Sequence, residues 1–234
     1  MSSGGFIGNI GPDEIKWLVQ VMIVLILSIA VHEFGHAFVA DRLGDRLPRS
    51  QGRVTLNPVA HADPIGTLLF PVLGFVFSGG HGLGFGWGRP VQVNPVAFTR
   101  RFTMRTGHML VAAAGPAMNI ALGLAVGAGY AVLVKTGVLS ATSELNVAIQ
   151  YAVFLNFILA FFNLIPAYPL DGGAVLEGFL PRRALDTWEQ IKVYGPFILM
   201  AFLFIGPLQR LFVAPAHWCY ASYLELWGLR PLFG

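Results

Sequence analysis

The stretch that decides the fold is residues 15–40, which read I-K-W-L-V-Q-V-M-I-V-L-I-L-S-I-A-V-H-E-F-G-H-A-F-V-A. It is apolar and long enough to cross the hydrocarbon core of a bilayer, for which a helix needs about 20 residues. It nevertheless carries the ionisable groups His32, Glu33 and His36. Ionisable groups at membrane depth are costly, so we expect these three to form a functional site inside a transmembrane helix.

The spacing of these residues, H-E-x-x-H, is typical of zinc sites on helices. Histidines four residues apart lie on one face of a helix, so His32 and His36 can bind the same ion, and Glu33 can contact a water bound to it. A five-residue pattern also arises by chance, and a histidine pair on a soluble helix is often a surface feature. The apolar context favours the metal site, because an unpaired glutamate there would be expelled or neutralised.

The composition is that of an integral membrane protein. Of the residues, 55% are hydrophobic and only 12% are charged, and the mean hydropathy is +0.66. The net charge is +3 without a dense basic run, so we expect no nucleic-acid partner. No repeat, soluble linker or cleavable signal is recognisable, so residues 1–234 are interpreted as one domain whose first span is retained. The single cysteine, Cys219, excludes an internal disulfide and a cysteine zinc site.

Hydropathy predicts an all-α polytopic membrane protein with about four transmembrane helices. Their ranges are 15–40, 109–134, 147–166 and 193–213. Residues 65–78 are also apolar but short, which favours a re-entrant or interfacial helix. Alternating β-branched and aromatic residues at 52–57 and 85–94 predict two short strands, which would form a small β-hairpin-like element near the active site.

Basic residues orient the predicted spans. They gather after the first span, before the second, and between the third and fourth, at Arg42, Arg46, Arg49, Arg53, Arg89, Arg100, Arg101, Arg105, Arg182, Arg183 and Lys192. Loops rich in Lys and Arg stay in the cytoplasm, so we expect the N-terminus outside and the histidines in the cytoplasmic half of the first helix. The same rule favours a re-entrant element at residues 65–78, because both of its flanks then stay on one side.

Asp171 is the candidate third zinc ligand. It follows the third predicted span, on the same side of the membrane as His32 and His36, in the stretch N-L-I-P-A-Y-P-L-D-G-G at 163–173. The other interpretation is an ordinary interfacial aspartate that caps a new helix. A catalytic zinc site needs a third protein ligand at this depth, which favours the first interpretation.

Several segments together resemble a known family. They are H-E-F-G-H at 32–36, G-R-V-T-L-N-P at 52–58, G-P-A-M-N at 115–119 and N-L-I-P-A-Y-P-L-D-G-G at 163–173. In this order they resemble the site-2 protease family of intramembrane zinc metalloproteases, and the resemblance covers almost the whole chain. Tyr168 stands where the family often has proline. The family's PDZ and CBS modules have no counterpart, so the chain resembles a minimal form.

The resemblance implies regulated intramembrane proteolysis, in which peptide bonds are hydrolysed within or near transmembrane segments. The implied substrate is a single-span, membrane-tethered regulator such as an anti-sigma factor. The implied location is the inner or cytoplasmic membrane, as a multi-pass protein with its active site toward the cytoplasm. One Zn²⁺ per chain would be held by His32, His36 and Asp171, with Glu33 as general base. Asn119 would be a catalytic oxyanion donor, although close helix packing in its segment is the alternative.

A substrate helix must unwind before it is cleaved, and an extended segment of the enzyme could replace its lost hydrogen bonds. We expect the strands at 52–57 and 85–94 to provide such an edge and Asn163 to bind substrate backbone. A structural hairpin and a helix-terminal amide are the alternatives. His61 and Asp63 are interpreted as structural residues rather than as a second metal site.

The other function class that fits is a non-proteolytic metal-binding membrane protein, either a transporter or a catalytically silent scaffold. Such a protein needs the two histidines but no general base at Glu33. Transporters also usually show an internal repeat, which this sequence lacks. Both observations favour the zinc endopeptidase.

Overall fold

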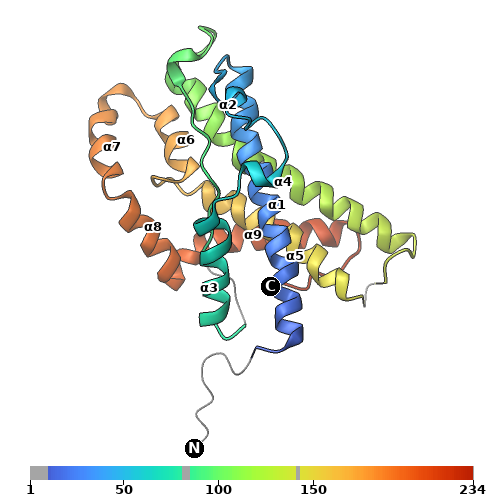
Figure 1. Ribbon diagram of the computed structural model, residues 1–234. Coiled ribbons are helices and arrows are strands. Elements are labelled where there is room, and N and C mark those ends of the chain that lie inside the picture. The colour runs from blue at the N-terminus through green and yellow to red at the C-terminus, as the bar shows by residue number, and fades with distance from the viewer. Residues whose placement is uncertain (1–9, 81–84, 141–142, 234) are drawn as a thin grey trace, which may run out of the picture.

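The computed structural model describes residues 10–80, 85–140 and 143–233, and every regular element in those ranges is helical (Figure 1). In chain order the elements are α1 (Pro12–Arg42), α2 (Leu47–Ser50), η1 (Pro58–Ala60), η2 (Pro64–Leu69), α3 (Phe70–Phe77), η3 (Pro95–Ala97), α4 (Met104–Lys135), α5 (Glu144–Asn163), α6 (Asp171–Phe179), η4 (Arg182–Ala184), α7 (Leu185–Lys192), α8 (Gly195–Phe204) and α9 (Gly206–Leu226). The predicted all-α class is confirmed.

Three helices, α1, α4 and α5, are long and apolar enough to cross a membrane. The bent pair of α8 and α9 adds a fourth span if the pair is counted as one. Along α1, the side chains of Ile15, Val19, Ile23 and Leu27 are 52%, 52%, 54% and 48% exposed, and their spacing of four residues puts them on one face. An exposed apolar stripe of this kind suits contact with lipid. The chain is therefore a multi-pass membrane protein.

The fourth predicted span, residues 193–213, is not one straight helix. The structure has an angle of 80° between α8 and α9, and α9 continues past the predicted end. Pro207, at the start of α9, has no backbone N–H with which to continue the hydrogen bonding of α8. The carbonyl oxygen of Leu203 instead accepts a hydrogen bond from the Gln209 side chain, with Nε2 at 2.6 Å. The missing N–H explains why the helix breaks here.

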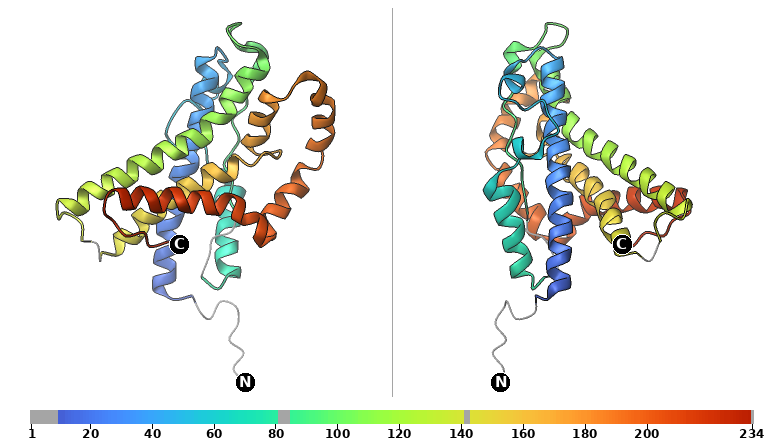
Figure 2. Two further views of the ribbon diagram at one scale, coloured as in Figure 1. Left: turned by 180° about the vertical axis from the view of Figure 1, so that it is seen from behind. Right: turned by 45° about the vertical axis from the view of Figure 1, so that its right-hand side comes forward.

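The long helices pack in the order α1, α4, α5 and α9. α3 lies on one side of α1, and α4 crosses its other side (Figure 2). Where α1 meets α4 the backbones come close, since a Cβ at Gly35 would lie 2.7 Å from the Ala114 carbonyl oxygen. A core between α4, α5 and α9 includes Tyr130, Phe157 and Tyr220. The crossing places α4 directly against the H-E-x-x-H part of α1.

The short helix predicted at residues 65–78 is present as η2 and α3. From the α2 end of the molecule, α3 runs beside α1 toward its N-terminal half, and the chain then returns to the end at which α4 begins (Figure 1). Asp63 caps this segment by accepting hydrogen bonds from the N–H groups of Ile65 and Gly66 at 3.0 and 2.6 Å. Because the segment enters and leaves at the same end, its course favours a re-entrant element.

The predicted β-hairpin is wrong. Residues 52–57 form turns and coil, and residues 85–94 have no strand partner within the described ranges. The segment bonds to loop carbonyls instead, from Trp87 N to Gly66 O at 3.2 Å and from Arg89 N to His61 O at 2.8 Å. The alternating pattern therefore indicates an extended chain, but the loops around η1 and η2 supply its hydrogen-bond partners.

Candidate metal centre and active site

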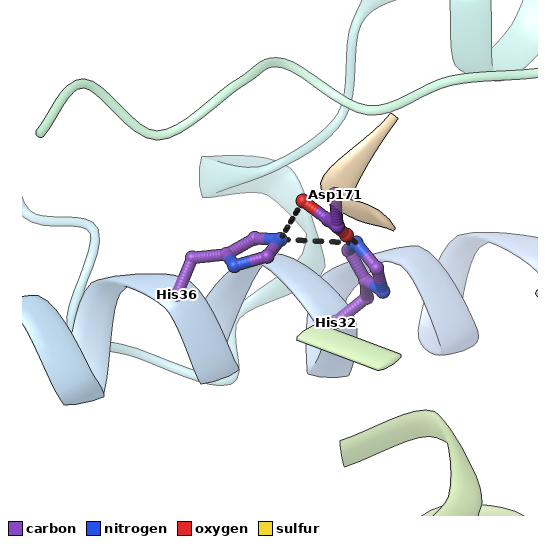
Figure 3. Close-up of side chains that lie close together, drawn as sticks. All are labelled: His32, His36 and Asp171. Carbon is purple, nitrogen blue, oxygen red and sulfur yellow. Dashed lines mark hydrogen bonds and ion pairs between the residues drawn. The ribbon is translucent and has the colours of Figure 1, made fainter. Parts of the chain in front are cut away.

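Three potential metal ligands converge between α1 and the start of α6 (Figure 3). His32 and His36 project from α1, and Asp171 is the first residue of α6. The Nε2 atoms of the two histidines are 3.1 Å apart. Asp171 places Oδ2 3.1 Å from His32 Nε2 and Oδ1 3.4 Å from His36 Nε2. The structure thus brings together the three ligands that the sequence predicts.

A tight connection positions Asp171. α5 ends just before residues 164–170, which turn back, and α6 starts immediately after them. A Cβ at Gly172 would lie 2.3 Å from the carbonyl oxygens of Leu164 and Ile165, so glycine is needed for α6 to start this close to the end of α5. The free N–H groups in the first turn of a helix also favour a carboxylate there.

Hydrogen bonds on the far side of each imidazole fix its orientation and tautomer. His36 Nδ1 lies 2.8 Å from the Val111 carbonyl oxygen, and His32 Nδ1 lies 2.6 Å from Asn119 Oδ1. Both partner atoms are acceptors, so each Nδ1 carries the proton and each Nε2 offers a lone pair to the cluster. This is the tautomer in which an imidazole binds a metal through Nε2.

The cluster fits a metal cation. Two Nε2 lone pairs face one another at 3.1 Å beside a carboxylate, an arrangement that is repulsive without a positive charge between the groups. Asp171 Oδ2 is buried and accepts no hydrogen bond from the described residues, although buried polar atoms are normally satisfied. Two imidazole nitrogens and a carboxylate oxygen form a donor set that zinc uses in catalytic sites, where a fourth position stays open.

Glu33 lies beside the cluster on the wall of a cavity of about 730 Å³. Its Oε2 accepts a hydrogen bond from the backbone N–H of Val91 at 3.2 Å, which holds the carboxylate next to the extended segment 85–94. The cavity is lined mainly by apolar residues of α1, α5, α8 and that segment. The three candidate metal ligands also lie on its wall. A candidate base, three candidate metal ligands and an extended segment of the chain therefore line one mostly apolar cavity.

Comparison with known proteins agrees with this geometry. The family model described as Peptidase family M50 matches residues 132–206. YwhC of Bacillus subtilis (strain 168) is 38% identical over 192 residues, which cover 80% of this chain and 81% of YwhC. The chain belongs to peptidase family M50.

Other relatives of this M50 peptidase are similar over much of its length. Rip2 of Mycolicibacterium smegmatis is 30% identical over 235 residues, which cover 95% of this chain and 85% of Rip2. MJ0392 of Methanocaldococcus jannaschii is 25% identical over 179 residues, which cover 75% of this chain and 38% of MJ0392. All three relatives are named as zinc metalloproteases, and this chain is a membrane metalloprotease with zinc as its cofactor. No solved structure matches the chain.

Gly115 of this M50 peptidase packs directly against the cluster. A Cβ there would lie 2.4 Å from His36 Nε2 and 2.7 Å from His32 Cε1. The sequence pattern suggested only close helix packing or catalysis for the segment 115–119. The structure shows that its glycine leaves the space in which the two imidazoles meet.

We expect Gly115→Ala to lower zinc affinity by about 10-fold or more, because the added methyl group displaces the imidazoles of His32 and His36 themselves. Competition with a chromophoric chelator measures this affinity on the purified protein. Gly129→Ala is the matched control on the same helix, because a Cβ there meets nothing within 4 Å and alanine is favoured over glycine in a helix. Equal zinc affinities of the two variants would contradict the placement of the imidazoles against α4.

Asn119 is fully buried and contacts His32 from the side away from the cluster. Both hydrogens of its amide are used, because Nδ2 donates to the Ser28 carbonyl oxygen at 3.1 Å and to Asn156 Oδ1 at 2.9 Å. In this geometry no amide hydrogen is left for an oxyanion. The oxyanion role stays a prediction, and the contacts favour a role in orienting a zinc ligand.

The sequence also singled out Asn163, His61 and Asp63, and none of the three belongs to the group of candidate metal ligands. Asn163 lines the cavity and donates from Nδ2 to the Leu159 carbonyl oxygen at 2.9 Å, and its contact with substrate stays a prediction. His61 is buried, with Nε2 2.8 Å from the Thr55 carbonyl oxygen, and Asp63 caps η2. Among the described residues, the cluster already described is the one group able to hold a metal ion. These contacts agree with structural roles for His61 and Asp63.

Sequence reasoning missed Ser28 and Asn156. Each is 1% exposed, and their side chains meet, with Asn156 Nδ2 donating to Ser28 Oγ at 2.9 Å. Neither residue belongs to a recognisable motif. The available signal was a polar residue inside an apolar transmembrane segment, because such residues usually have a buried partner or a function.

Proposed function

We propose that this M50 peptidase is an intramembrane endopeptidase that hydrolyses peptide bonds within or near transmembrane segments of membrane-tethered regulatory proteins. The observation that supports this most is the cavity of about 730 Å³. A candidate base and three candidate zinc ligands lie on its wall, between helices apolar enough to span a membrane. A mostly apolar cavity suits the apolar side chains of a transmembrane substrate.

The proposed roles of the residues follow from their positions. His32, His36 and Asp171 would hold one zinc ion, which would supply a Lewis acid able to polarise a scissile carbonyl and to lower the pKa of a water molecule. Glu33 would take the proton of that water and return it to the leaving amine. The hydrogen bond from Val91 would keep the carboxylate oriented between these two proton transfers.

The extended segment 85–94 offers a place for the substrate backbone. The backbone N–H groups of Trp87, Arg89 and Val91 are hydrogen-bonded within the protein. Successive N–H groups of an extended chain point to opposite sides, and those of Gly86 and Gly88 have no partner among the described residues. A substrate strand paired with this edge would regain hydrogen bonds that its helix loses on unwinding.

We further propose that the active site faces the cytoplasmic side of an inner or cytoplasmic membrane. Arginines gather where α1 ends and α4 begins, at Arg42, Arg46, Arg49, Arg100, Arg101 and Arg105. His32 and His36 lie in the half of α1 nearer this end, and an excess of basic residues is typical of the cytoplasmic side. The proposed partners are the bilayer and a single-span protein substrate, which Asn163 would contact within the single domain 1–234.

A cleavage assay tests the proposal. The chain purified in detergent is incubated with a panel of single-span transmembrane peptides, with zinc present or removed by a chelator, and mass spectrometry locates the cut. Cleavage inside the apolar segment that stops with chelator and returns with zinc is the expected result. Cleavage of soluble peptides alone, or zinc binding without cleavage of any peptide, would overturn the proposal.

We also expect cleavage to depend on how easily the substrate helix unwinds. Gly disfavours a helix by about 1 kcal/mol and Pro by about 3 kcal/mol relative to Ala. A host peptide with Gly or Pro beside the scissile bond should therefore be cut about 5-fold faster, or more, than its Leu version. Cleavage rates of the three peptides measure this, with the same replacements far from the bond as controls. Equal rates would show that unwinding does not limit the reaction.

A further inference from the structure

The polar side chains behind His32 form a chain of hydrogen bonds across three helices. Asn156 of α5 donates from Nδ2 to Ser28 Oγ at 2.9 Å and to the Ala152 carbonyl oxygen at 2.8 Å. Its Oδ1 accepts from Asn119 Nδ2 of α4 at 2.9 Å. Asn119 Oδ1 in turn lies 2.6 Å from His32 Nδ1 of α1. The chain of bonds thus ends on a candidate zinc ligand.

The orientation of Asn119 depends on the acceptors on the side away from His32. A side-chain amide has a donor end and an acceptor end, so either end of Asn119 could in principle face His32. Asn156 presents its oxygen to Asn119, because its own NH₂ group donates to the Ala152 carbonyl oxygen, which can only accept, and to Ser28 Oγ. Asn119 Nδ2 donates to this oxygen and, at 3.1 Å, to the Ser28 backbone carbonyl oxygen, so the two acceptors together turn its NH₂ group away from His32 and its oxygen toward His32.

The orientation of Asn119 selects the metal-binding tautomer of His32. With an oxygen in front of it, Nδ1 carries the proton, and Nε2 offers its lone pair to the cluster. A flipped Asn119 would present NH₂ to Nδ1 and favour a proton on Nε2, where the metal must bind. The tautomer of His36 does not depend on a side-chain amide, because its Nδ1 faces the backbone carbonyl of Val111, which can only accept a hydrogen bond.

We infer that Asn156 and Ser28 are positioning residues for the zinc ligand His32 and act through Asn119. The inference rests on the proposed coordination of zinc by His32. Neither Asn156 nor Ser28 is among the residues that line the cavity, and each is 1% exposed, so a direct contact with substrate does not explain them. Both stand in helices apolar enough to span a membrane, where a polar side chain needs a partner or a function.

The zinc affinity of Asn156→Leu tests the inference, with the full chain in detergent and a chromophoric chelator as competitor. Groups that hydrogen-bond to metal-binding histidines typically contribute about 10–100-fold to metal affinity. We therefore expect Asn156→Leu to lower the zinc affinity by about 10-fold or more. Asn119→Leu should lose at least as much. Adding Asn156→Leu to Asn119→Leu should then change little, because the two residues act in one network. Ser28→Ala should weaken zinc binding, and Ser28→Thr, which keeps the hydroxyl, should restore it.

Gln150→Leu is the matched control. Gln150 is also a 1% exposed amide on α5, but it bonds to Tyr130 and Tyr220, with 3.1 Å from Nε2 to Tyr130 Oη and 2.6 Å from Tyr220 Oη to Oε1. This variant should melt at a lower temperature and keep the parental zinc affinity. Parental affinity in Asn156→Leu, an equal loss in Gln150→Leu, or additive losses in the Asn119→Leu, Asn156→Leu double variant would each overturn the inference.

His32→Ala separates this inference from the proposed metal coordination. Loss of zinc in His32→Ala together with parental binding in Asn156→Leu would overturn the positioning role alone. Zinc retained at parental affinity in His32→Ala would overturn the coordination itself.

Discussion

Glu33→Gln is expected to keep zinc bound and to lower the rate of transmembrane peptide cleavage by about 100-fold or more, in line with the contribution of a general base. Glutamine has the size of glutamate, and its oxygen can still accept the hydrogen bond from the N–H of Val91. It cannot take a proton from water at neutral pH. Cleavage rate at saturating peptide and bound zinc, measured on the same sample, test both parts of the expectation.

Glu225→Gln is the control for this variant. Glu225 is exposed near the end of α9 and is not among the residues that line the cavity, so the same chemical change there should leave the rate and the zinc content at parental values. Cleavage by Glu33→Gln within a fewfold of the parent would exclude Glu33 as the base. Loss of zinc from Glu33→Gln would instead show that the carboxylate helps to hold the metal.

Asp171→Ala is expected to lower zinc affinity by more than the roughly 10–100-fold typical of a group that hydrogen-bonds to a metal-binding histidine, because it removes a direct ligand. The variant leaves His32 and His36 with their Nε2 lone pairs 3.1 Å apart and without the Asp171 carboxylate next to them. Bound zinc is measured at submicromolar free zinc, where the parent is expected to hold one ion per chain. Peptide cleavage should disappear together with the metal.

Asp186→Ala provides the comparison for Asp171→Ala. Asp186 is exposed on α7, so its removal takes away one carboxylate without touching the cluster, and zinc binding should not change. Full zinc stoichiometry in Asp171→Ala at submicromolar free zinc would remove Asp171 from the direct ligands. The two histidines would then need a third ligand from another part of the chain.

The metal chemistry was predictable because it depends on local periodicity. His32 and His36 share a face in any α-helix, since residues four apart are neighbours on its surface. The length of residues 15–40 predicts a span because the bilayer sets the length of any helix that crosses it. Asp171 could be paired with the histidines through its depth in the predicted topology, and the structure places it beside them.

The wrong β-hairpin prediction and the bend within the fourth predicted span both concern properties that local patterns do not contain. Alternation at residues 85–94 indicates an extended chain, but not whether a strand or a loop will supply its hydrogen-bond partners. Here the carbonyls of Gly66 and His61 supply them. Hydropathy across residues 193–213 indicates an apolar segment but not its direction, which changes by 80° just before α9.

The sequence by itself determined that the protein is built from long apolar helices and which residues are candidates for zinc binding, because these depend on residue type and short-range spacing. Only the tertiary structure decided which residues contact the candidate metal ligands from the neighbouring helices. Asn119 meets Asn156 across 37 positions and Ser28 across 91, and Gly115 meets the imidazoles from another helix. Such contacts depend on where α1, α4 and α5 cross, and helix crossings are set by the packing of side chains that lie far apart in the sequence.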